Sequence, residues 1–120
     1  MVERLLGPTY FDGDIMNIVI ANGPGRLDNG SDVILFPSRW DSAVARAPFR
    51  FYPYELALLS TLLKRELPRI KTTLLDGNLH GWDKRRYTAE IARLAPDVLI
   101  CECSALTYST MTAVMQAVDP

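Results

Sequence analysis

Short, continuous apolar runs alternate along the chain with segments whose apolar residues are spaced three or four positions apart. Continuous apolar runs are typical of parallel strands buried on both faces, and they predict strands near residues 16–21 and 97–102. A further strand near residues 71–75 is predicted by its place in the alternation and by the turn signal Asp76-Gly-Asn78 that closes it. The spaced segments predict amphipathic helices near residues 53–66, 83–94 and 107–118. This alternation implies right-handed crossovers and therefore predicts a three-layer α/β fold with a flavodoxin-like (Rossmann-like) parallel sheet.

The predicted helices carry signals at their ends and on their faces. Pro53 suits the first position of a helix, Leu67-Pro68 ends that helix, and Asp83 can cap the second helix. On the first helix, the leucine spacing predicts a wide buried face made of Leu56, Leu59 and Leu63, with Leu58 and Leu62 beside them. The inner positions expected on the other two helices are Tyr87, Ile91 and Leu94, and then Met111, Val114, Met115 and Val118.

The third strand is expected at an edge of the sheet, because a flavodoxin-like sheet places the first strand between the second and the third. The run from Val98 to Cys101 is highly apolar, and proteins normally protect such an edge. We therefore expect residues 16–120 to be the front half of a larger doubly wound domain, incomplete at the C-terminus, or to have this edge completed by a partner. Self-association through the third strand is one such completion. Residues 1–15 are expected to form an N-terminal arm.

Ligands of open parallel sheets bind beyond the carboxyl ends of the strands, where the strand order reverses. Here that point lies between the first and third strands, which are followed by the loops 22–52 and 102–107. Asp76 leaves the neighbouring strand at the same end. The first loop is unusually long and aromatic-rich, and loops of that length are usually functional or disordered. These features together predict a cofactor or substrate site at this edge.

The residues that follow the third strand have two interpretations. Glu102 and Ser104 are candidates for ligand contact, since they stand where the apolar run stops. Alternatively, Ser104 or Thr107 caps the next helix and Glu102 is merely solvated.

Composition narrows the classes of function. The net charge is −1, from 13 basic and 14 acidic residues, which gives no support for nucleic-acid binding. No apolar run approaches the ~20 residues that cross a bilayer, and the first fifteen residues lack the long apolar stretch of a signal peptide. Cys101 and Cys103 are interpreted as reduced, buried thiols of a cytoplasmic protein, and two cysteines cannot supply a four-cysteine metal or iron–sulfur site.

Three other motifs are weak. Gly23-Pro-Gly25-Arg-Leu-Asp28 lacks the third glycine of a dinucleotide fingerprint, and no helix opens behind it. His80 is the only histidine, and it is interpreted as a loop residue rather than a metal ligand or an acid/base. The basic run from Lys84 to Arg86 is interpreted as a solvated face rather than a phosphate site.

Four segments, in this order and spacing, resemble the N-terminal cobalamin (B12)-binding domain of radical S-adenosylmethionine enzymes. Met16-Asn-Ile-Val-Ile-Ala-Asn-Gly-Pro24 looks like the opening strand and turn of that domain. Phe51-Tyr-Pro-Tyr-Glu-Leu-Ala-Leu-Leu59 is similar to its "YPP-x-x-LA-x-L" helix start. Leu74-Leu-Asp-Gly77 is similar to its second-strand ending. Pro96-Asp-Val-Leu-Ile-Cys-Glu-Cys-Ser104 is similar to its "PDVV-x-(I)-E-(T/S)-S" third strand.

The resemblance implies a corrinoid-binding module, apparently truncated, that serves a radical S-adenosylmethionine barrel in the same or a neighbouring chain. It implies cobalamin contacts from Asn22, Gly23, Pro24, Gly25, Tyr52, Pro53, Asp76, Glu102, Ser104 and Leu106. The family's Asp-x-His-x-x-Gly signature is absent after the first strand, and His80 does not substitute for it. No Cys-x-x-x-Cys-x-x-Cys triplet is present, so an iron–sulfur cluster and S-adenosylmethionine are expected only in a missing downstream domain.

Two alternatives to a corrinoid module remain open. The first is a cofactor-free flavodoxin-like module with a regulatory or protein-interaction role. The second is a fragment of an enzyme that acts on a nucleotide sugar or another small molecule. This chain alone is not expected to be catalytic.

Overall fold

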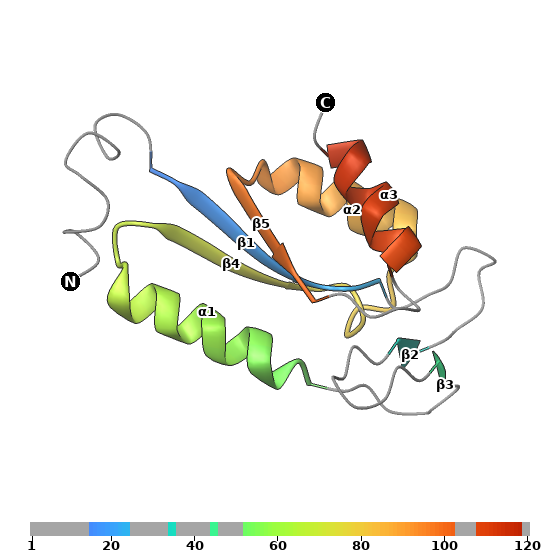
Figure 1. Ribbon diagram of the computed structural model, residues 1–120, viewed down its shortest axis with the longest axis horizontal. Helices are drawn as coiled ribbons and strands as arrows, with labels where there is room; N and C mark the ends of the chain where they lie inside the picture. Colours follow the sequence, from blue (N-terminus) through green and yellow to red (C-terminus); the bar gives the residue numbers. More distant parts are fainter. Residues whose placement is uncertain (1–14, 25–33, 36–43, 46–51, 103–107, 119–120) are drawn as a thin grey trace.

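The computed structural model describes residues 15–24, 34–35, 44–45, 52–102 and 108–118 (Figure 1). Its main sheet is parallel, with the strand order β4–β1–β5, and consists of β1 (Asn17–Asn22), β4 (Lys71–Asp76) and β5 (Val98–Cys101). The helices are α1 (Tyr54–Glu66), α2 (Lys84–Leu94) and α3 (Tyr108–Val118). A short antiparallel pair joins β2 (Ile34–Leu35) to β3 (Val44–Ala45). The predicted α/β class and the order second–first–third are confirmed.

The sheet is covered on both faces, with α1 on one side and α2 and α3 on the other (Figure 1). Central β1 is buried along its whole length because both of its faces are covered. Its side chains alternate between the two layers, as strand geometry requires. Ile18 and Ile20 pack with Leu56 of α1, whereas Val19 and Ala21 join a cluster formed with Tyr87, Ile91, Met111 and Val114 of α2 and α3.

The helix ends follow local chemistry. Asp83 caps α2 as expected, since its Oδ1 accepts a hydrogen bond of 2.8 Å from the backbone N–H of Arg86. Ala95 ends α2 in the left-handed conformation at φ 47°. Pro53 was expected at the first helical position, but it is the N-cap and its ψ of 75° is not helical. The helix therefore begins at Tyr54.

Three burial predictions were wrong. Leu58 and Leu62 are 47% and 38% exposed, because α1 packs mainly against β4 and β1 and buries a narrower face than predicted. Met115 of α3 is 42% exposed. Strand β5 is not buried on both faces, since Val98 is 39% exposed and the rest of the strand is half-buried. The exposure of Met115 and the exposure of β5 have one cause, which is that β5 lies at the edge of the sheet.

The expected arm, residues 1–15, lies outside the described residues except for Ile15, which is exposed. Gly25, Ser104 and Leu106 also lie outside them, as do Cys103 and Thr107. None of the helices in the described part of the chain combines the length and the apolarity that a membrane-spanning segment needs.

Candidate functional site

The three parallel strands end at one edge of the sheet, and the helices that follow them begin there (Figure 1). From β1 the chain passes to α1 on one face, and from β5 it passes to α3 on the other face. The point between these strands is therefore the switch point at which open α/β sheets bind ligands. The last residues at this edge are Asn22 of β1, Asp76 of β4 and Glu102 after β5.

A side-chain hydrogen bond joins the ends of β1 and β4. Asn22 and Asp76 are register partners, and the Nδ2 of Asn22 donates to the Oδ1 of Asp76 at 2.9 Å. The Oδ1 of Asn22 accepts the backbone N–H of Gly23 at 3.1 Å, and the Oδ1 of Asp76 also accepts the N–H of Leu79 at 2.9 Å. Asn22 is only 3% exposed. We call these two side chains the Asn22–Asp76 clasp, and they hold a carboxylate in a fixed position at the edge.

The two glycines beside the clasp differ in their surroundings. A Cβ on Gly77 would lie 2.6 Å from Cδ2 of Tyr87 and 3.0 Å from the carbonyl oxygen of Gly23, so only glycine fits there. A Cβ on Gly23 would meet nothing within 4 Å among the described residues. Pro24, the next residue, is fully buried. Among the described residues, the space over Gly23, beside Asn22, is therefore unfilled.

Tyr87 of α2 packs against this turn. It is fully buried, its ring lies against Gly77, and its hydroxyl finds no hydrogen-bond partner in the described part of the chain. Burial raises the pKa of its phenol, and the nearby Cys101 and Asp76 raise it further. Tyr87 therefore stays neutral and is unsuited to act as a base near neutral pH. Sequence reasoning treated Tyr87 as a core residue only, and nothing in the local pattern indicates its contact with Gly77.

The predicted site residues are thus only partly brought together. Asn22, Gly23 and Asp76 form one hydrogen-bonded group with Pro24 beside it, while Glu102 stands half-buried at the end of β5. Tyr52, which is 72% exposed, and half-buried Pro53 lie at the start of α1, which begins at the same edge. The remaining predicted contacts, Gly25, Ser104 and Leu106, lie outside the described residues.

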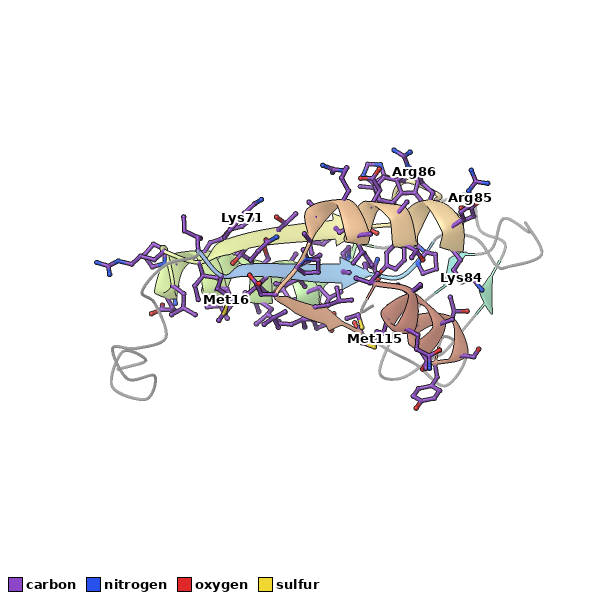
Figure 2. All side chains as sticks on the ribbon, turned by 90° about the horizontal axis from the view of Figure 1, so that it is seen from above. Met16, Lys71, Lys84, Arg85, Arg86 and Met115 are labelled. Atoms are coloured by element: carbon purple, nitrogen blue, oxygen red, sulfur yellow. The ribbon has the colours of Figure 1, made fainter. Side chains whose placement is uncertain are left out.

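His80 and the basic turn of α2 form a separate exposed group. The ring of His80 stacks on Trp82 with the centroids 4.6 Å apart, and the guanidinium of Arg86 lies 5.9 Å from the Trp82 ring. Arg86 also pairs with Glu90 at 2.6 Å. Figure 2 shows Arg85 and Arg86 pointing outward, and both are exposed. This arrangement agrees with the interpretation of Arg85 and Arg86 as a solvated face, whereas Lys84 is half-buried.

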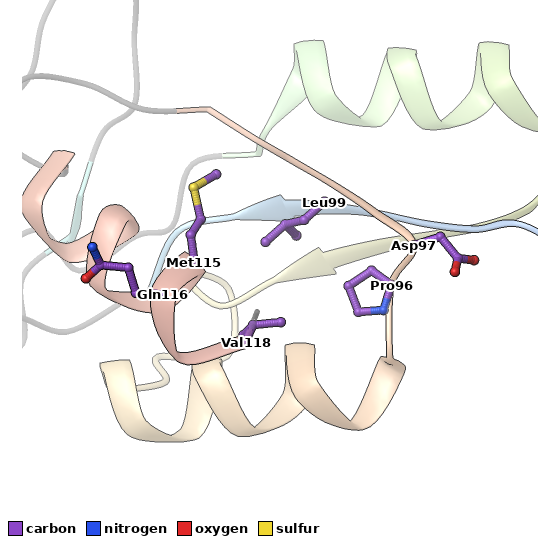
Figure 3. Close-up of a pocket in the computed structure, with 6 residues that line it drawn as sticks. All are labelled: Pro96, Asp97, Leu99, Met115, Gln116 and Val118. Atoms are coloured by element: carbon purple, nitrogen blue, oxygen red, sulfur yellow. The ribbon is translucent and has the colours of Figure 1, made fainter. Parts of the chain in front are cut away.

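A metal site and a surface hollow are the other features to consider. No group of three His, Cys, Asp or Glu side chains in the described ranges could hold a metal ion. A hollow of about 570 Å³ lies near the start of β5 and the end of α3, at the far end of β5 from the clasp (Figure 3). It is lined by Pro96, Asp97, Leu99, Met115, Gln116 and Val118.

Comparison of this chain with family models, with curated proteins and with solved structures finds no match.

Proposed function

We propose that this chain binds a corrinoid at the carboxyl edge of its sheet, as the cobalamin-binding module of a cytoplasmic radical S-adenosylmethionine enzyme. The observation that carries the proposal is the Asn22–Asp76 clasp beside Gly23, over which the described residues leave space. It combines a fixed polar pair with room for a ligand, and it lies at an end of the sheet where ligands of this fold class bind. The choice of a corrinoid as the ligand is supported by the four segments that resemble the cobalamin-binding domain.

The chemistry of the described residues suits the rim of a corrinoid. A corrin ring is flat and is fringed by amide side chains, which both donate and accept hydrogen bonds. The carboxylates of Asp76 and Glu102 can accept from such amides, and the absence of a side chain at Gly23 allows close approach of a ligand to the backbone. When bound, the corrinoid would supply alkyl-group transfer, while the cluster and S-adenosylmethionine would belong to the barrel.

His80 is not assigned to the cobalt. Its ring is stacked on Trp82, with the centroids 4.6 Å apart. The proposed module therefore holds the ring by its rim, through Asn22 to Pro24 and Asp76, and supplies no imidazole. A His80→Ala variant should accordingly retain as much corrinoid as the unmodified chain.

The test is retention of hydroxocobalamin by the purified chain after desalting, measured as visible absorbance per protein. We expect a coloured protein, and we expect Gly23→Leu to lose at least ten times in affinity because the new side chain fills the proposed ligand space. Lys71→Leu places the same side chain on β4 at the amino edge and should leave binding unchanged. A colourless unmodified chain, or a Gly23→Leu variant that binds as well, would contradict the proposal.

A cofactor-free protein-interaction module is the second candidate. It is favoured by one observation, which is that β5 and α3 contain no charged residue. The hydroxocobalamin test distinguishes the two functions. An interaction module would associate with a protein partner but would remain colourless after incubation with hydroxocobalamin.

A further inference from the structure

We draw no further inference here: the strongest candidate, the hollow of about 570 Å³ between the start of β5 and the end of α3 (Figure 3), is lined by apolar and polar residues alike, and nothing in the described part of the chain shows what would occupy it.

Discussion

At the scale of single residues, the Asn22–Asp76 clasp depends on an uncharged partner for the carboxylate. Asn22→Asp would place two carboxylates at hydrogen-bonding distance, and they repel each other when both are ionised. We expect the free energy of unfolding to fall by about 2–3 kcal/mol at pH 7, the loss typical of a hydrogen bond to a charged group.

The loss should shrink toward pH 4, because the folded variant can then share one proton between the two carboxyl groups. Urea unfolding of the variant and the unmodified chain at both pH values measures this difference. A loss equal at pH 4 and pH 7 would mean that the hydrogen bond, rather than charge repulsion, dominates the effect. Asn22→Ser, which adds no charge, serves as the control.

The two glycines at the edge give a matched pair. Gly77→Ala forces a Cβ against the Tyr87 ring and should lower the free energy of unfolding by about 1–3 kcal/mol, the usual cost of overpacking a core. Gly23→Ala adds a Cβ that meets no described residue within 4 Å and should change stability by less than about 0.5 kcal/mol. Denaturant unfolding of both variants checks the contrast, and equal losses would contradict the packing described for this turn.

The sequence predicts Asn22, Gly23 and Asp76 as site residues because each ends a strand, and the ends of parallel strands share an edge. It does not predict the contact between Gly77 and Tyr87. These residues are close only because α2 packs against the sheet near the end of β4. The orientation of α2 on the sheet depends on side-chain packing rather than on periodicity.

At the scale of elements, α2 carries a charge network in which the buried Glu90 pairs with two exposed arginines. Glu90 accepts from Arg93 at 2.9 Å and pairs with Arg86 at 2.6 Å. The hydrogen bond from Arg93, followed by the charges of Arg86 and Arg93, lowers the pKa of Glu90 despite the opposing effect of burial. The folded state therefore binds a proton at Glu90 less readily than the unfolded chain does.

The stability that this network contributes is therefore fully present at pH values above the ordinary glutamate pKa of 4.5. It is lost as the pH falls through the lowered pKa of Glu90. We expect Glu90→Gln to lower stability at neutral pH and to flatten the acid side of the stability–pH profile. Thermal melts between pH 2 and pH 7 measure both effects, with Glu66→Gln on α1 as an exposed control. If Glu90→Gln leaves the loss of stability at acidic pH unchanged, other carboxylates are responsible for that loss.

The elements themselves are largely predictable. The cap at Asp83 and the helix stop at Leu67-Pro68 follow from residue chemistry, and the structure confirms both. The exposure of Leu58, Leu62 and Met115 does not follow, because an amphipathic pattern gives the direction of the core but not its width. That width depends on how many strands lie beneath each helix, and here the described sheet has only three.

At the scale of the whole molecule, two surfaces with different chemistry occupy different parts of one sheet. The carboxyl edge presents the polar clasp, whereas β5 and α3 themselves contain no charged residue. Connection rules predict the strand order and therefore the place of β5 at an edge of the described sheet. The hollow beside β5 is not predictable, because its shape depends on where α3 packs against the strand.

The most direct test of the proposed ligand site is hydrogen exchange of the full chain with and without saturating hydroxocobalamin, read by mass spectrometry. The account predicts slower exchange in peptides that contain Asn22 to Pro24 and Asp76 to His80, with no change in peptides from α1 beyond its first turn. Protection confined to β5 and α3, or no protection anywhere, would contradict a corrinoid site at the carboxyl edge.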